Sequence, residues 1–269
     1  MAFKPTQTIL QAYSYVFLGY LLLPLVVMCG AAFNDSRFPT ILPWNGFTWR
    51  WFAELYNDTT IWQATANTGL VAIAVVAISV PIGVAGAILV NSLKGRSRTL
   101  LYATMIAPIL TPGAVIGIST LLFWYKFNAP AGLQISVLAQ TSFIAAYVML
   151  MVLARLQSFD GALEEAALDL GASHAQMLRR VLLPHLYPAI LGGAVLAFFQ
   201  SVENFNATQF TRGASTTLTV YVGSKVRTGI TPSICALAAI MISITILGAI
   251  IYEIIRRNNL AKAETLQAQ

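Results

Sequence analysis

The sequence predicts an all-α integral membrane protein with six transmembrane helices and a cytoplasmic helix-turn-helix loop. The chain of 269 residues is 57% hydrophobic and only 10% charged, with a mean hydropathy of +0.72, which is more apolar than a soluble core requires. Its apolar residues gather in six stretches of roughly 20 residues, the length of helix that crosses the hydrocarbon layer. The polar stretch between the fourth and fifth of these has helical periodicity. We expect one domain over residues 1–269.

The six apolar stretches define the expected spans. They run from Tyr13 to Phe33, Ala64 to Val90, Leu100 to Tyr125, Ile135 to Leu156, Ala189 to Phe210 and Ile234 to Ile255. The first is too long for the apolar region of a signal peptide. Pro81 in the second span, and Pro108 and Pro112 in the third, predict kinks. Such kinks could form a gate, although membrane helices also tolerate proline where it only affects packing.

The basic residues predict the orientation of these spans, because cytoplasmic loops carry an excess of Lys and Arg. Ten lie on the side of both termini: Lys4, Lys94, Arg96, Arg98, Arg155, Arg179, Arg180, Arg256, Arg257 and Lys262. Six lie on the other side: Arg37, Arg50, Lys126, Arg212, Lys225 and Arg227. We therefore expect a multi-pass protein of the bacterial inner membrane, in contact with lipid, with both termini cytoplasmic. The net charge of +6 then marks orientation, and no nucleic-acid partner is expected. The outer loop from Asn34 to Trp62 is either a lid or a plain connector.

Residue patterns typical of catalysis and metal binding are missing from the sequence. Cys29 and Cys235 lie far apart in apolar stretches, so they form no disulfide framework or zinc pattern. No lysine stands in a GxxxxGK[ST] loop, and neither HExxH nor GxSxG occurs. We therefore expect no catalytic residue, no metal site and no cofactor within this chain.

The cytoplasmic loop, about residues 158–188, has the pattern of two short helices. Asp160 can cap the first helix, and Gly171 fits a helix stop. The first helix carries one apolar stripe at helical spacing, made of Leu163, Ala166, Ala167 and Leu170. Because several of these residues are small, another surface could approach the backbone closely.

The second predicted helix of this loop begins with a capping box. Ser173 and Gln176 have the spacing in which each side chain satisfies the other's backbone N–H. Its apolar side carries Met177, Leu178, Val181 and Leu182. We expect Pro184 to end this helix, because proline lacks a backbone N–H and clashes with the preceding turn.

The outer half of the fifth span is polar. Its polar residues are Gln200, Ser201, Glu203, Asn204, Asn206, Thr208 and Gln209. A carboxylate at membrane depth usually faces protein or water, so Gln200, Glu203, Asn204 and Asn206 are candidates for lining a solute path. Helical spacing would place Gln200, Glu203 and Ala207 along one side. Two alternatives remain: the span ends early and Glu203 lies in an outer loop, or Glu203 pairs with a basic residue of a partner.

The cytoplasmic loop also carries a recognisable motif. It consists of Glu165, Ala166 and Ala167, then Gly171, then Val181, Leu182, Leu183 and Pro184. This motif resembles the EAA loop of binding-protein-dependent ABC importer permeases, which usually has isoleucine at the position of Val181. The resemblance implies that the loop docks into a cytoplasmic ATPase dimer, which binds ATP and Mg²⁺ in place of this chain. It also implies a second, similar permease and an extracytoplasmic solute-binding protein, although a pair of identical permeases remains an alternative.

Within that family, the chain resembles the second permease of spermidine and putrescine importers. The residues that carry this likeness are Thr217-Leu218, Tyr221, Lys225-Val226-Arg227, Gly229, Thr231-Pro232 and Ala236-Leu237-Ala238. The resemblance implies import of a polyamine or of a related amine or opine-like solute. Three other classes of protein remain as alternatives: a secondary transporter driven by an ion gradient, an intramembrane enzyme, and an assembly subunit without a path. The secondary transporter does not explain the EAA pattern, and an intramembrane enzyme would need more than the single Glu203 at membrane depth. Solute flux through the complex would distinguish an assembly subunit.

Overall fold

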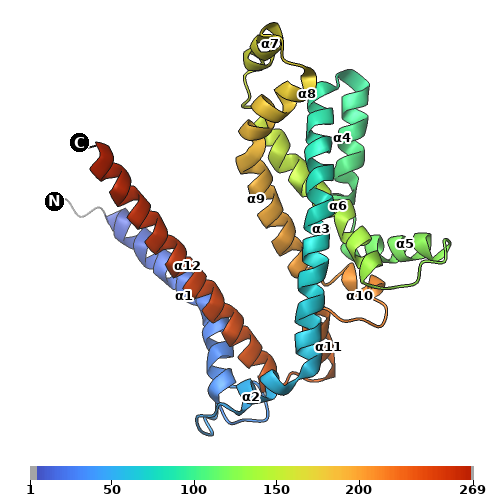
Figure 1. Ribbon diagram of the computed structural model, residues 1–269. Helices are drawn as coiled ribbons and strands as arrows, with labels where there is room; N and C mark the ends of the chain where they lie inside the picture. Colours follow the sequence, from blue (N-terminus) through green and yellow to red (C-terminus); the bar gives the residue numbers. More distant parts are fainter. Residues whose placement is uncertain (1–4, 268–269) are drawn as a thin grey trace. The chain divides into compact units, whose positions relative to one another are not determined.

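The computed structural model describes the backbone of residues 5–267, which is almost entirely helical, as predicted (Figure 1). The helices in chain order are α1 (Pro5–Phe33), α2 (Arg50–Asn57), α3 (Thr59–Ser92), α4 (Gly95–Leu110), α5 (Gly113–Tyr125), α6 (Leu133–Leu156), α7 (Gly161–Asp169), α8 (His174–Met177), the π-helical segment η1 (Leu178–Leu182), α9 (Leu183–Val202), α10 (Thr208–Thr211), α11 (Leu218–Thr228) and α12 (Pro232–Gln267). Within the described residues, five helices are long and apolar enough to cross a membrane, or six if α4 and α5 form one bent span. Lys4, which counted toward the predicted orientation, lies outside them.

The chain divides into two compact units, and one consists of Met1–Thr59 with Ser224–Gln269. In this unit α1 and α12 pack side by side and run in opposite directions (Figure 1). The start of α1 and the end of α12 therefore lie at the same end of the unit. Both helices expose long apolar side chains, such as Leu22 and Ile251. Such surfaces suit contact with lipid, in which helices with all backbone groups bonded are stable.

The other unit, Thr60–Gly223, has a core built mainly between α3, α6 and the continuous helix formed by α8, η1 and α9. Val75, Val148 and Leu186, from these three helices, are completely buried. Gly83 lets α3 approach α6 closely, because a Cβ atom there would lie 2.6 Å from Cβ of Val148. Small residues commonly allow such contacts between membrane helices.

The predicted third span, Leu100 to Tyr125, is broken between α4 and α5, whose axes are bent by 107°. Thr111 adopts the extended conformation (φ −92°, ψ 132°) that a following proline favours, and Pro112 then precedes α5. The predicted kink is confirmed, but it is a sharp bend between two helices.

The predicted end of the fifth span at Phe210 was wrong. Helix α9 ends at Val202, and Glu203 is its C-cap. Residues 203–207 form turns before α10 begins at Thr208. The physical reason is that Asn204 and its neighbours bond the local backbone, which competes with a continuing helix.

The prediction that Pro184 ends a short second helix was also wrong, because one helix of 29 residues runs from His174 to Val202. Leu183 N–H donates to the oxygen of Leu178, which makes a wide π turn before the proline. Pro184 then stands in the first turn of α9, where its missing N–H costs little. Segment η1 therefore carries the chain past the proline without ending the helix.

Candidate functional site

The first part of the loop at about residues 158–188 is a well-capped helix. Asp160 Oδ1 accepts a hydrogen bond of 3.0 Å from Ala162 N, which confirms the predicted cap of α7. Gly171 has a φ of +81°, a left-handed conformation that glycine adopts without strain. Nothing lies within 4 Å of a Cβ atom built on it. The turn after α7 is therefore sharp and open on its outer side.

The predicted capping box begins the next helix. Ser173 Oγ accepts from Gln176 N at 3.3 Å, and Gln176 Oε1 accepts from Ser173 N at 2.9 Å. Two N–H groups that a helix start leaves without intrahelical partners are satisfied in this way. The helix from His174 to Val202 thus starts at a defined residue directly beyond the Gly171 turn.

The apolar stripe of α7 and of Leu170, which follows it, is not covered by the described part of the chain. Leu163 is 53% exposed and Leu170 is 89% exposed. Glu165 and Ala166 are also exposed, whereas Ala167 packs against the core. On the following helix, Val181 and Leu183 are half-buried and Pro184 is exposed. The exposed apolar or small residues of this loop are therefore Leu163, Ala166, Leu170 and Pro184, beside the charged Glu165.

The base of the loop is attached to α6. Arg155 Nε donates to the oxygen of His185 at 3.2 Å. The rings of Phe159 and His185 lie 5.1 Å apart between centroids. These contacts tie the entry of the loop to the start of α9, so that both sides of the loop have a fixed base.

The candidate path residues at and beyond the end of α9 fall into two groups. Glu203 and Asn206 are exposed and Gln200 is half-buried. Asn204 instead caps the local backbone, because its Oδ1 accepts from Ala207 N at 3.2 Å and from Thr208 N at 3.4 Å. The predicted grouping of Gln200, Glu203 and Ala207 on one helical side was wrong: the helix has ended, and Ala207 is buried against α5.

The sequence analysis missed a buried polar cluster beside these residues. Gln140 of α6 bonds Ser201 at the end of α9 and Thr208 at the start of α10. Ser136, one turn earlier on α6, bonds the hydroxyl of Thr211 at 2.8 Å. The signal was present, because an amide within an apolar span is costly unless it is bonded.

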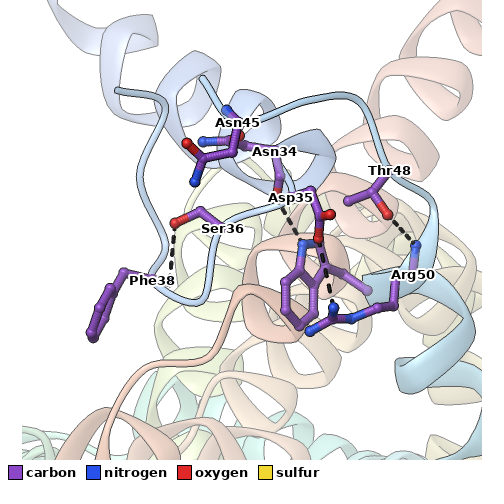
Figure 2. A network of polar contacts seen from close by, with 8 residues as sticks. Asn34, Asp35, Ser36, Phe38, Asn45, Thr48 and Arg50 are labelled. Carbon is purple, nitrogen blue, oxygen red and sulfur yellow. Dashed lines mark hydrogen bonds and ion pairs between the residues drawn. The ribbon is translucent and has the colours of Figure 1, made fainter. Parts of the chain in front are cut away.

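The loop between α1 and α2 is ordered by one buried side chain (Figure 2). Asn34, fully buried, donates to the backbone oxygens of Thr40 and Pro43 and accepts from Asn45 N. Its own backbone oxygen accepts from Trp51 Nε1 at 2.8 Å. Arg50 forms a 3.6 Å ion pair with Asp35 in the same loop (Figure 2). The segment is therefore folded on itself.

Comparison with protein families gives a match over most of the chain. The profile of the family described as "Binding-protein-dependent transport system inner membrane component" matches residues 79–260.

Among the residues that the structure describes, no group of three or more His, Cys, Asp or Glu side chains could hold a metal ion.

Individual relatives agree with this family match. The chain is 30% identical to the spermidine/putrescine transport system permease protein PotC of Haemophilus influenzae, over 93% of this chain and 96% of the relative. It is also 30% identical to the putrescine transport system permease protein PotI of Escherichia coli, over 92% of this chain and 91% of the relative. The fold is also similar to that of a chain in the crystal structure of a bacterial alginate ABC transporter in complex with an alginate pentasaccharide-bound periplasmic protein. The TM-score is 0.72 and the sequence identity is 18%, over 92% of this chain and 91% of that chain.

Proposed function

The chain belongs to the family of binding-protein-dependent transport system inner membrane components, and we propose that it is a permease subunit of an ATP-driven polyamine importer. The names of the two relatives support the substrate class, because both are permeases for putrescine or for spermidine and putrescine. The solute would cross the membrane between this subunit and a second, similar permease. ATP and Mg²⁺ would be bound by a separate ATPase dimer.

The uncovered surface of α7 carries this proposal. Exposure of Leu163 and Leu170 to water is unfavourable, because removing apolar area from water lowers the free energy. An ATPase subunit that covers this surface would supply that burial. The proposed docking residues are Glu165, Ala166, Ala167, Gly171, Val181, Leu183 and Pro184. The small residues allow close contact, and the open side of the Gly171 turn leaves room for the partner.

The proposed solute path includes Gln200, Glu203, Asn204 and Asn206. The exposed Glu203 carboxylate suits an ammonium group, because charge-assisted hydrogen bonds are among the strongest. Asn206 adds amide groups that can bond a second polar end of the solute. Asn204 would act indirectly, since it already caps the backbone that presents its neighbours.

The proposed orientation places the loop about residues 158–188 and both termini in the cytoplasm. The excess of basic residues on that side supports it. The opposite side of the permease pair would receive a solute-binding protein. The complex of the structurally similar alginate transporter with its periplasmic protein supports such a partner.

Uptake by the complete complex tests the function. The complex would be reconstituted in proteoliposomes and supplied with ATP inside, the solute-binding protein outside and labelled spermidine or putrescine. We expect uptake that requires both ATP and the binding protein, and that continues when ion gradients are collapsed by ionophores. Uptake driven by an ion gradient alone would instead assign the protein to the secondary transporters.

Opine-type amino-acid derivatives serve as the second set of labelled solutes. Uptake of these zwitterions without any polyamine uptake would contradict the polyamine assignment. It would also move the main contacts from the Glu203 carboxylate to the amides of the path.

A further inference from the structure

Gln140 lies in the first third of α6 and is only 1% exposed. Its Oε1 accepts from Ser201 Oγ at 2.5 Å, and its Nε2 donates to Thr208 Oγ1 at 2.8 Å. Ser201 belongs to the last turn of α9 and Thr208 is the first residue of α10. One buried amide therefore joins the two ends of the break at residues 203–207.

The hydrogen bonds of this cluster determine the direction of the amide. Asn204 Oδ1 can only accept, and it lies 3.3 Å from Thr208 Oγ1, so the Thr208 hydroxyl donates to it. That hydroxyl has one proton, so it must accept from Gln140. The Gln140 nitrogen then faces Thr208, and its oxygen is left to accept from Ser201. Each bond in the series supports the next, which strengthens the cluster in a low-dielectric interior.

Two further contacts hold the same break from outside the cluster. Thr219 Oγ1 donates to the backbone oxygen of Asn204 at 3.1 Å. Gly113 of α5 also approaches the break closely, because a Cβ atom added to it would lie 3.1 Å from Cβ of Asn206. The backbone of the break is thus fixed on several sides, while the side chains of Glu203 and Asn206 remain exposed.

From this geometry we infer that Gln140 is a positioning residue for the solute path, which sets where Glu203 and Asn206 meet the solute; the inference rests on the proposed function. Gln140 does not touch the solute itself, because it is buried. It holds Ser201 and Thr208 at a fixed separation, and the turn between them presents the carboxylate. A purely apolar contact at this position could fill the same volume but could not fix the two hydroxyls.

The first test is polyamine uptake by the complete complex carrying Gln140→Leu. We expect the KM for spermidine to rise about tenfold, the effect of losing one to two buried hydrogen bonds, with the maximal rate retained. Thr141→Val is the matched control on the next residue of α6, because Thr141 is buried and its hydroxyl has no hydrogen-bond partner among the described residues. A merely structural role would lower the amount of folded complex and the maximal rate in proportion, and would leave KM unchanged.

A second measurement is independent of transport. Glu203→Cys, in a chain that also carries Cys29→Ala and Cys235→Ala, is labelled with a water-soluble maleimide with and without Gln140→Leu. We expect Gln140→Leu to change the labelling rate severalfold and Thr141→Val to leave it unchanged. Equal labelling with and without Gln140→Leu, together with an unchanged KM, would overturn the inference. If the unmodified complex takes up no polyamine, the proposed function fails, and the labelling rates alone then decide whether Gln140 positions the break.

Discussion

Gly117 of α5 packs directly against the backbone of Ala207, so closely that an added Cβ atom would lie 2.7 Å from the Ala207 oxygen. We expect Gly117→Ala to push the 203–207 break away from α5. The cost should be about 1–3 kcal/mol, as for other overpacked sites, with loss of polyamine uptake. The midpoint of thermal unfolding and uptake in proteoliposomes would measure both effects. Gly69→Ala in α3 is the control, since nothing lies within 4 Å of its Cβ position. It should be neutral or slightly stabilising.

Gly171→Arg should prevent the ATPase from binding while the chain still inserts into the membrane. The left-handed backbone there strains any other residue by about 1–2 kcal/mol, and the long side chain would fill the open side of the turn. Co-purification of the ATPase with the permease measures the effect. Gly95→Arg is a matched control, because Gly95 also has a positive φ of +61° and open space around its Cβ position. Equal loss of the ATPase in both variants would mean that strain, rather than docking, is responsible.

Leu170→Ser should weaken ATPase binding without destabilising the permease alone. The side chain is 89% exposed, so its removal leaves no cavity in this chain. If the ATPase buries this side chain, the side chain should contribute about 2 kcal/mol to binding, so its loss should weaken the affinity roughly 30-fold. Titration of the detergent-solubilised permease with ATPase measures that change. Leu42→Ser, at 79% exposure in the loop between α1 and α2, should not change it.

Glu203→Gln should raise the KM for spermidine and putrescine and leave ATPase binding intact. The variant keeps the size of the side chain but removes the charge that would attract an ammonium group. A charge-assisted hydrogen bond is stronger than a neutral one by about 1 kcal/mol, so KM should rise about fivefold. Glu54→Gln, an exposed carboxylate on α2, is the control for the change in net charge. Unchanged transport kinetics would return Glu203 to the role of an ordinary loop residue.

Asn34→Ala should loosen the loop between α1 and α2. The change removes two donated bonds and one accepted bond, at a cost of about 2 kcal/mol for the loop. Hydrogen exchange at the backbone amide of Asn45, which donates to Asn34, should accelerate about 30-fold. Asn45→Ala removes an exposed side chain and keeps that amide, so exchange there should stay slow. Slow exchange of the Asn45 backbone amide in both variants would show that the structure of the loop does not depend on Asn34.

The helix starts in the loop at about residues 158–188 could be predicted because their signals are local. The cap at Asp160 and the capping box of Ser173 and Gln176 depend on residues two or three positions apart. The left-handed Gly171 likewise depends only on its own backbone. The all-helical, apolar character of the chain also follows from composition, and among the described residues five helices are long and apolar enough to span a membrane, or six if α4 and α5 form one span.

Periodicity alone does not predict the end of α9, where a local cap by Asn204 is combined with contacts distant in sequence. Ser201 and Thr208 are bonded by Gln140, which lies more than 60 positions earlier on α6. The passage of the helix through Pro184 depends on the π turn at η1, for which periodicity gives no signal. The roles of the candidate docking and path residues remain predictions, which the variants above test.

If the helix from His174 to Val202 moved as one rigid rod, it would act as a lever. At 29 residues it is roughly 44 Å long. A tilt of about 5° about one end would move the other sideways by about 4 Å, which is close to the separation of two carbon atoms in contact. Small rotations at the Ser173 end would therefore be magnified into steps of atomic size beside Glu203, where they would be large enough to open or close a narrow passage.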